Sequence, residues 1–197
     1  DGLPYYVMPF VDGESLRARL ARERQLPVAD AVGIAREVSD ALSHAHGHGV
    51  VHRDIKPENI LLEAGHAVVA DFGVAGAVWE AGGERLTRTG LVVGTPGYLA
   101  PEQALGEGGV DARSDVYALG CVLYEMLAGQ PPITGPTAAA VLARKVTETP
   151  KGVREVRPTV APELESVIAR ALSLVPADRQ RTATELTHEL EAVTPGR

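Results

Sequence analysis

The stretch VVHRDIKPENILLE (residues 50–63) gathers a histidine, an asparagine, two basic residues and three acids, with apolar residues near both ends. Ordinary surface charge is one explanation for such a loop. The other explanation is chemistry, because acids, bases and amides held close together can orient reactants and neutralise charge that develops during a reaction. The surrounding sequence decides between the two explanations.

Length and composition describe a globular domain. The chain has 197 residues, of which 45% are hydrophobic and 23% charged, so it can bury a sizeable core. A net charge of −7 argues against general nucleic-acid binding. The single cysteine, Cys121, cannot form an internal disulfide, which predicts a buried thiol in a reducing compartment, the cytoplasm. The longest apolar run, 116–124, is far below the roughly 20 residues that a transmembrane helix needs.

Hydrophobic periodicity predicts a mainly α-helical lobe. Ile34, Val38, Leu42 and Ala45 form one stripe of an amphipathic helix, and residues 112–128 are apolar nearly all round, which predicts a buried central helix. Strands are expected at 4–10 and in a hairpin formed by NILLE (59–63) and HAVVADFG (66–73). Loops are expected at 74–98 and 148–162. The expected helices span residues 15–24, 29–48, 112–128, 137–147, 164–172 and 183–193.

Three histidines, His44, His46 and His48, stand at the end of the second expected helix. A metal cluster is one interpretation. Alternate spacing on a helix spreads the three side chains around the axis, and basic groups at a helix C-terminus are favourable in any case. The pattern therefore favours a structural role.

Four separated motifs occur in a fixed order, and together they resemble the C-terminal lobe of a bacterial serine/threonine protein kinase of the eukaryotic (Hanks) type. The motifs are HRDIKPEN (52–59), DFG (71–73), GTPGYLAPE (94–102), and SDVYALG (114–120) with DR (178–179). The resemblance implies a mainly α fold, a helical bundle around a buried central helix with short hairpins at the active-site face. It implies that residues 1–197 comprise the hinge and the C-terminal lobe of a kinase domain.

The resemblance assigns chemistry to four residues of the first two motifs. Asp54 is expected to orient the substrate hydroxyl and accept its proton, and Lys56 to neutralise charge on the moving phosphoryl group. Asn59 and Asp71 are expected to hold Mg²⁺ through oxygen ligands, with ATP as the phosphoryl donor. An isolated Asp is more often a turn residue or a helix cap, but Asp54 and Asp71 lie inside complete motifs.

Five further residues are expected to be structural by the same resemblance. His52 and Phe72 would stack beneath the site. Asp115 would accept backbone N–H bonds from the catalytic loop. Glu102 and Arg179 would form a buried ion pair that anchors the activation segment, and loss of one partner would cost about 3–5 kcal/mol.

The stretch YYVMPFVDG (5–13) resembles the strand and hinge that hold adenine in kinases, although a plain core strand is the alternative. Met8 would be the gatekeeper. Pro9 would offer its carbonyl and Val11 its backbone groups, while Leu61 would form the floor under the ring. Ser15 could touch the ribose, but a helix N-cap is the favoured role.

Substrate choice and control are also implied by the resemblance. Lys56 together with GTPGYLAPE is the serine/threonine pattern, and Thr95 would shape the pocket for the residue after the target hydroxyl. Arg53 precedes the catalytic aspartate, as in kinases that are switched by activation-loop phosphorylation. Thr87 and Thr89 are the expected phosphorylation sites, with ordinary surface threonine as the alternative.

Three parts of a working kinase are missing from the 197 residues: the Gly-rich loop, the strand lysine and its helix glutamate. The first residue is expected to be a cut edge, so this chain alone should bind ATP poorly and expose an apolar face toward a missing N-terminal lobe. A pseudokinase scaffold and a small-molecule kinase are the alternatives. The intact Asp54, Lys56, Asn59 and Asp71 disfavour the first, and the APE segment disfavours the second. The expected partner is a protein carrying the target Ser or Thr.

Overall fold

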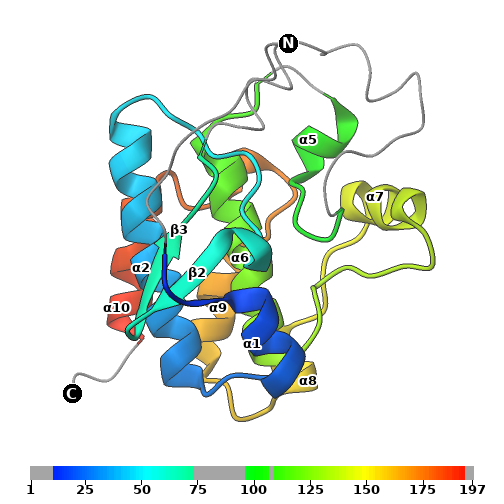
Figure 1. Ribbon diagram of the computed structural model, residues 1–197. Helices are drawn as coiled ribbons and strands as arrows, with labels where there is room; N and C mark the ends of the chain where they lie inside the picture. The colour runs from blue at the N-terminus through cyan, green and yellow to red at the C-terminus, as the bar shows by residue number, and fades with distance from the viewer. Residues whose placement is uncertain (1–10, 73–95, 107–108, 194–197) are drawn as a thin grey trace, which may run out of the picture.

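The computed structural model describes residues 11–72, 96–106 and 109–193, which form a helical lobe with one small sheet (Figure 1). The mainly α fold predicted from the sequence, a helical bundle around a buried central helix with a short hairpin, is confirmed. Among the described residues no helix combines the length and the apolar character needed to cross a membrane.

The axis of the lobe is helix α6 (Ala112–Ala128), which is buried from Ser114 to its end. The Asp111 side chain caps its first turn by accepting from the N–H of Arg113, and Gly129 ends it in the left-handed region at φ 83°. Gly120 allows close packing, since a Cβ there would lie 2.9 Å from the Cβ of Ala171. An all-round apolar sequence therefore becomes the buried helix that it predicts.

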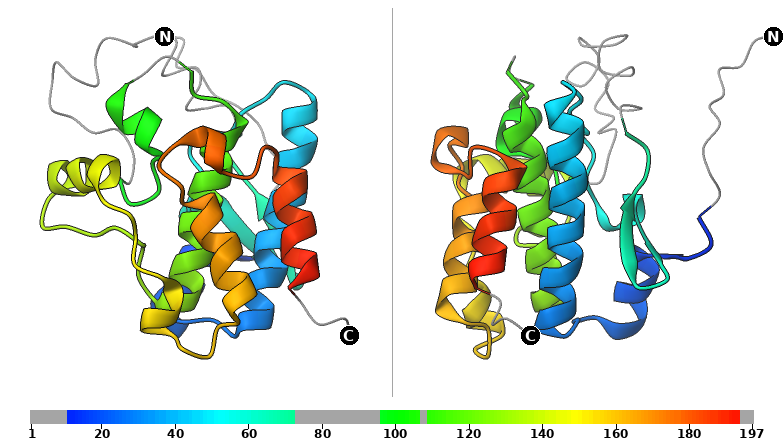
Figure 2. Two further views of the ribbon diagram at one scale, coloured as in Figure 1. Left: turned by 180° about the vertical axis from the view of Figure 1, so that it is seen from behind. Right: turned by 90° about the vertical axis from the view of Figure 1, so that its left-hand side faces the viewer.

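Other helices surround α6 in layers. Helix α2 (Val28–Gly47) packs beside α6, with α9 (Pro162–Ala171) and α10 (Ala183–Ala192) on one side and the sheet with α1 (Leu16–Glu23) on the other (Figure 2). Each of these helices lies within two residues of its expected bounds, because each carries an apolar stripe that faces the core.

The sheet has three antiparallel strands in the order β1 (Glu14–Ser15), β2 (Ile60–Glu63), β3 (His66–Val69). The hairpin predicted for β2 and β3 is confirmed, with Ile60 opposite Val69. Strand β1 is too short to carry a period-2 pattern, and it pairs with β2 immediately before α1 begins. The Ser15 hydroxyl accepts from the N–H of Ala18 at 3.2 Å, so Ser15 is the N-cap of α1. The strand expected at 4–10 lies outside the described residues.

Among the described residues, two short α-helices and two 3₁₀ helices (Pro57–Asn59 and Pro176–Asp178) occur where no helix was expected. Helix α5 (Pro101–Leu105) follows the GTPGY segment, and α8 (Val153–Val156) lies inside the stretch 148–162 that was predicted to be a loop. Four or five residues are too few to show a helical period, so the sequence could not reveal them. Helix α7 (Ala138–Thr147) lies where a helix was expected at 137–147, and the Thr137 side chain caps its first turn.

Candidate active site

Asp54 is the centre of a group of polar side chains that the loop after α2 brings together. Lys56 donates from Nζ to Asp54 Oδ2 at 2.6 Å. The Nδ2 of Asn59 donates to the same oxygen at 3.1 Å and to the Asp54 carbonyl at 2.8 Å. A short 3₁₀ helix (Pro57–Asn59) turns Asn59 back toward Asp54. A carboxylate, an ammonium group and an amide are thus held in contact.

Asp115 on the central helix fixes the backbone of this loop. Its two carboxylate oxygens accept from the backbone N–H groups of His52 and Arg53, each at 2.8 Å. Arg53 has a φ of 69°, in the left-handed region that a non-glycine residue seldom adopts, so the loop needs such an anchor. The Asp115 side chain is fully buried, where charge-assisted hydrogen bonds are strongest.

His52 joins the loop to the end of β3. Its Nδ1 accepts from the N–H of Asp54 at 3.2 Å, so its Nε2 carries the proton and donates to the Ala70 carbonyl at 2.9 Å. The ring of Phe72 meets His52 edge-on, with centroids 4.7 Å apart, although Phe72 itself is 36% exposed. The Ala70 N–H donates to the Asn59 carbonyl at 2.9 Å, which places Asp71 next to Asn59 in the fold.

The donor set beside Asp54 fits a Mg²⁺ ion. Because the Asn59 amide nitrogen is used for Asp54, its amide oxygen is the group left to bind a cation. Asp71 follows β3 with a φ of 62° and supplies a carboxylate from the adjoining segment. Mg²⁺ typically takes one or two protein oxygens and completes its octahedron with water and phosphate oxygens.

The other residues expected at the nucleotide and substrate sites are only partly described. Leu61 lies on β2 and Val11 precedes β1, and both are half-buried. Met8, Pro9, Thr87, Thr89 and Thr95 lie outside the described residues.

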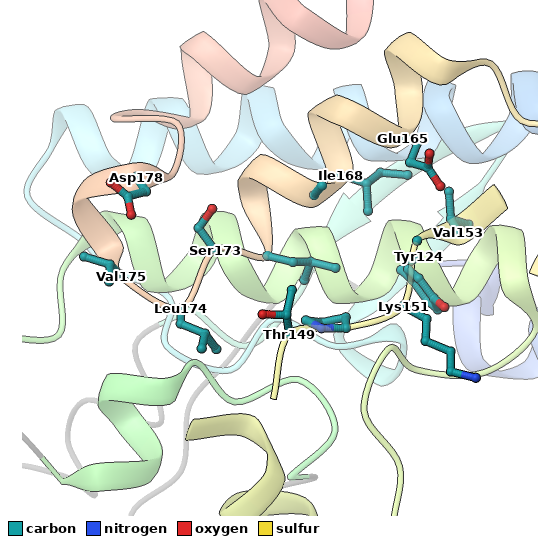
Figure 3. Close-up of a pocket in the computed structure, with 14 residues that line it drawn as sticks. Tyr124, Thr149, Lys151, Val153, Glu165, Ile168, Ser173, Leu174, Val175 and Asp178 are labelled. Carbon is teal, nitrogen blue, oxygen red and sulfur yellow. The ribbon is translucent and has the colours of Figure 1, made fainter. Parts of the chain in front are cut away.

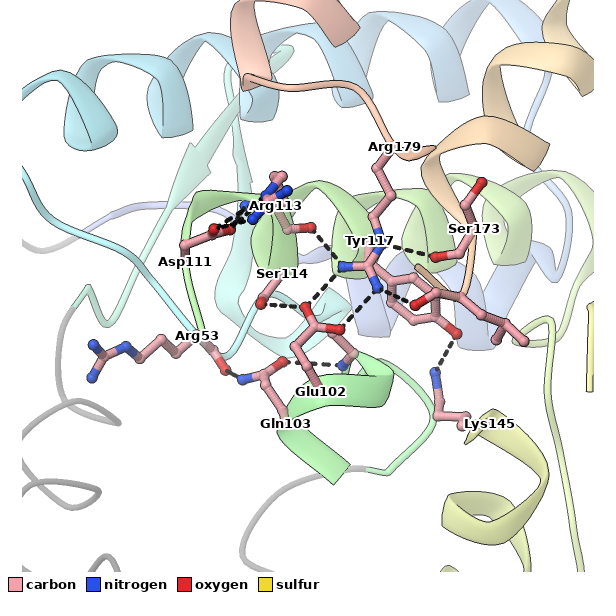
Figure 4. A network of polar contacts seen from close by, with 12 residues as sticks. Arg53, Glu102, Gln103, Asp111, Arg113, Ser114, Tyr117, Lys145, Ser173 and Arg179 are labelled. Atoms are coloured by element: carbon pink, nitrogen blue, oxygen red, sulfur yellow. Dashed lines mark hydrogen bonds and ion pairs between the residues drawn. The ribbon is translucent and has the colours of Figure 1, made fainter. Parts of the chain in front are cut away.

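Glu102 on α5 and Arg179 form a buried, bidentate ion pair (Figure 4). Both N–O distances are 2.8 Å, and Ser114 donates a further hydrogen bond to Glu102 at 2.6 Å. Burial alone would raise the pKa of the Glu102 carboxyl, but the hydrogen bonds from Arg179 and Ser114 outweigh it, and the pKa is lowered. The remaining N–H groups of Arg179 donate to the carbonyls of Ser173, Arg113 and Leu174, so every donor of the buried guanidinium is used.

Sequence reasoning did not find Lys145, which is fully buried on α7. Its Nζ lies 4.7 Å from the centre of the Tyr117 ring, and the Arg179 guanidinium carbon lies 4.8 Å from the same centre (Figure 4). Lys145 also contacts the Tyr117 hydroxyl at 3.4 Å and the buried thiol of Cys121 at 3.7 Å. Burial lowers the pKa of the Lys145 ammonium. The available signal was its spacing of four residues from the buried Val141.

Two further polar side chains support the loop at 52–59: His46, for which the sequence favoured a structural role, and Gln103, to which it assigned none. His46 donates from Nε2 to Asp115 at 2.8 Å, whereas His44 and His48 pack ring against ring, with centroids 4.6 Å apart. Gln103 on α5 donates to the Arg53 carbonyl at 2.9 Å. Within residues 11–72, 96–106 and 109–193, no three His, Cys, Asp or Glu side chains are grouped to hold a metal ion.

A separate pocket of about 300 Å³ lies between α6, α9 and the segment 149–153 (Figure 3). Tyr124, Ile168 and Leu172 form part of its lining. No residue between His52 and Phe72 borders it, so this pocket is distinct from the Asp54 group.

The chain is similar to known proteins along nearly its whole length. Residues 3–190 match the profile of the protein kinase domain. The chain belongs to the protein kinase family. It is 44% identical over 195 residues to the serine/threonine-protein kinase PknB of Mycolicibacterium smegmatis, covering 98% of this chain. It is 40% identical over 195 residues to the probable serine/threonine-protein kinase SCO3848 of Streptomyces coelicolor. The bacterial resemblance predicted from the sequence is confirmed.

The kinase chain spans only part of these relatives, 31% of the length of PknB from M. smegmatis and 29% of SCO3848. Among solved structures, it resembles the crystal structure of the Mycobacterium tuberculosis PknI kinase domain with a TM-score of 0.70 and 30% identity. That match covers 93% of this chain and 63% of the PknI chain.

Proposed function

We propose that this chain supplies the catalytic face of an ATP-dependent protein kinase that phosphorylates Ser or Thr hydroxyls of proteins. The observation that carries the proposal is the grouping of Lys56 and Asn59 on one oxygen of Asp54, at 2.6 and 3.1 Å. The loop that makes this group is fixed by buried Asp115. Such preorganisation is what phosphoryl transfer requires, because that reaction depends mainly on positioning and charge neutralisation.

The roles of the side chains follow from the contacts. Both side-chain contacts of Asp54 fall on Oδ2, and among the described residues Oδ1 makes no hydrogen bond, so Oδ1 can accept the proton of a substrate hydroxyl. The Lys56 ammonium beside it offsets negative charge on the transferred group. Asn59 and Asp71 would hold Mg²⁺, which neutralises phosphate charge when ATP is bound. His52 and Asp115 position the loop without touching the reactants.

Serine/threonine preference is supported by Lys56 in HRD-x-K and by the GTPGYLAPE segment. The names of the bacterial relatives agree with it. Lys56 and the GTPGYLAPE segment disfavour a tyrosine kinase, and the APE segment disfavours a small-molecule kinase.

We also propose that the Arg53 guanidinium pairs with a phosphate group carried by Thr87 or Thr89. Its side chain points away from the Glu102 network (Figure 4), and its Nε is buried with no hydrogen-bond partner among the described residues. A phosphothreonine would supply the missing acceptor. Mass spectrometry of the active protein should find phosphate on at least one of these threonines, and finding both bare would refute this regulation.

The 197 residues alone are proposed to transfer little or no phosphate, because no G-x-G-x-x-G loop or paired strand lysine occurs in them. The decisive comparison is therefore between this chain and the full-length protein, each with radiolabelled ATP, Mg²⁺ and matched Ser, Thr and Tyr peptides. The proposal predicts transfer by the full-length protein to Ser or Thr only. No transfer by the full-length protein, combined with retained binding of partners, would favour a scaffold instead.

A further inference from the structure

Arg17 on α1 bridges two acidic side chains that come from distant parts of the chain. Its Nε donates to Glu58 Oε1 at 2.8 Å. Its two terminal nitrogens donate to the two carboxylate oxygens of Glu125 on α6, at 2.9 and 3.4 Å. One guanidinium thus satisfies two carboxylates, with bidentate geometry on the second.

Tyr98 closes this network. Its hydroxyl accepts a hydrogen bond from Arg17 and donates one to Glu125 at 2.5 Å. Burial and the neighbouring Glu125 carboxylate raise the pKa of Tyr98, so its hydroxyl keeps the proton that it donates. The three partners of Arg17 come from the catalytic loop, the GTPGY segment and the central helix.

The network lies beside the proposed reaction centre and is open to solvent at one end. Glu58 is adjacent in sequence to Asn59 and four residues beyond Asp54. The Glu125 side chain is only 6% exposed, whereas those of Arg17 and Glu58 are 34% and 39% exposed. A peptide extends by about 3.3 Å per residue, so residues within a few positions of a hydroxyl at Asp54 can reach this opening.

Without Arg17, the solvent-exposed end of the network would hold the Glu58 and Glu125 carboxylates without a cation. Such a site attracts a guanidinium or ammonium group strongly, because a buried carboxylate is unfavourable unless it is paired. The nearest source of that group during the reaction is a basic side chain of the substrate itself.

We propose that Arg17 fills an acidic subsite from within and is a specificity-determining residue of the kinase. Its guanidinium stands where an arginine of the substrate would otherwise bind, so the enzyme has little preference for basic residues beside the target Ser or Thr. The proposal rests on the proposed function and deepens it by naming the substrate class, peptides whose flanking residues need not be basic.

A purely structural role for Arg17 predicts a different result. If Arg17 only tied α1 to the catalytic loop, its loss would lower activity on every peptide by the same factor. If Arg17 occupies a substrate subsite, its loss should instead change the ratio of kcat/KM between basic and neutral peptides. The ratio is therefore the measurement that separates the two roles.

The test uses the full-length protein and pairs of Ser peptides that differ only by Arg or Ala at one of the three positions on either side of the serine. Wild type should show ratios within about 3-fold, and Arg17→Ala should favour arginine by about tenfold or more at one position, the worth of one charge-assisted pair. The double variant Arg17→Ala with Glu58→Gln should lose most of this gain.

The matched control is Arg19→Ala, on the same helix and with its own exposed partners Glu23 and Asp30. It should leave the ratios unchanged.

A binding measurement that needs no catalysis completes the test. The Arg17→Ala protein should bind methylguanidinium saturably, seen as a rise in Tm, and about tenfold more tightly than wild type or the double variant. If Arg17→Ala does not fold, the same measurements are made with Arg17→Gln, which removes the cation but keeps hydrogen-bond donors near Glu125. Unchanged peptide ratios or no gain in methylguanidinium binding would overturn the proposal. If wild type phosphorylates no peptide, the proposed function fails while methylguanidinium binding still decides whether the acid pair is a guanidinium site.

Discussion

Glu102 and Arg179 lie 77 residues apart in the sequence and meet in two parallel hydrogen bonds of 2.8 Å inside the lobe. Arg179 is fully buried, and its guanidinium has no access to water. Arg179→Ala should therefore leave the Glu102 carboxylate buried without its cation and lower the free energy of unfolding by about 3–5 kcal/mol. Urea denaturation followed by circular dichroism measures this change.

The matched control is the exposed pair of Arg144 and Glu148, whose side chains are 44% and 45% exposed. Arg144→Ala should lower the free energy of unfolding far less than Arg179→Ala does, because water screens the pair. Equal effects of Arg144→Ala and Arg179→Ala would show that the buried pair does not stabilise the lobe.

Glu102 should also make the stability of the lobe depend on acid pH. Its pKa in the folded lobe is lowered from the ordinary value of 4.5. The carboxylate therefore contributes its full stability above about pH 4.5, and this contribution is lost as the pH falls through the lowered value. In Glu102→Gln, the Tm should therefore depend less on pH than in wild type between about pH 5 and the acid limit of folding. An unchanged slope would contradict the assignment.

Lys145 should destabilise the lobe at neutral pH. Burial lowers its pKa, so folding favours the neutral amine, and the penalty for burying the ammonium is relieved as the pH rises toward the ordinary value of 10.5. Lys145→Met, of similar length, should raise the free energy of unfolding at pH 7 by about 1–4 kcal/mol, with a smaller gain near pH 10. A loss of stability at pH 7 would mean that the contacts with Tyr117 and Cys121 outweigh the burial penalty.

Asp115 should control activity without touching substrate. Asp115→Ala removes the acceptor for two backbone N–H groups of the catalytic loop, and each lost bond costs about 1–3 kcal/mol. Misplacement of the loop should lower kcat by about 100-fold with a smaller effect on KM. Asp115→Asn keeps one acceptor oxygen and should restore part of kcat. Equal values for wild type and Asp115→Ala would exclude this positioning role.

Much of the fold could be predicted from patterns within single elements. Three examples are the all-round apolar run of α6, the stripe of Ile34, Val38 and Leu42, and the hairpin at 59–73. In each, the spacing of apolar residues within the element indicates which of its faces are buried. Short elements such as α8 carry too few residues for any period. The catalytic loop could be placed because HRDIKPEN is continuous in sequence.

No local pattern marks contacts between distant residues, so the sequence predicts only those that the kinase resemblance implies, such as the pair of Glu102 and Arg179. Arg17 meets partners 41, 81 and 108 residues away, and none of these separations is marked by a local pattern. Lys145 stands next to the exposed Arg144 on α7, and beyond its spacing from Val141 no local pattern distinguishes the two cations. The roles expected for Met8, Pro9, Thr87, Thr89 and Thr95 stay predictions, because these residues lie outside the described part of the chain.

The most direct test of the central claim is phosphoryl transfer by the full-length protein with Asp54→Asn. This substitution keeps the size of the side chain and removes the base, so transfer to Ser or Thr peptides should fall by at least about 100-fold with no change in Tm beyond a few degrees. Asp30→Asn, at an exposed carboxylate on α2 that pairs with Arg19, is the control and should keep full activity. Transfer at the wild-type rate by Asp54→Asn would contradict the claim that this loop performs the chemistry.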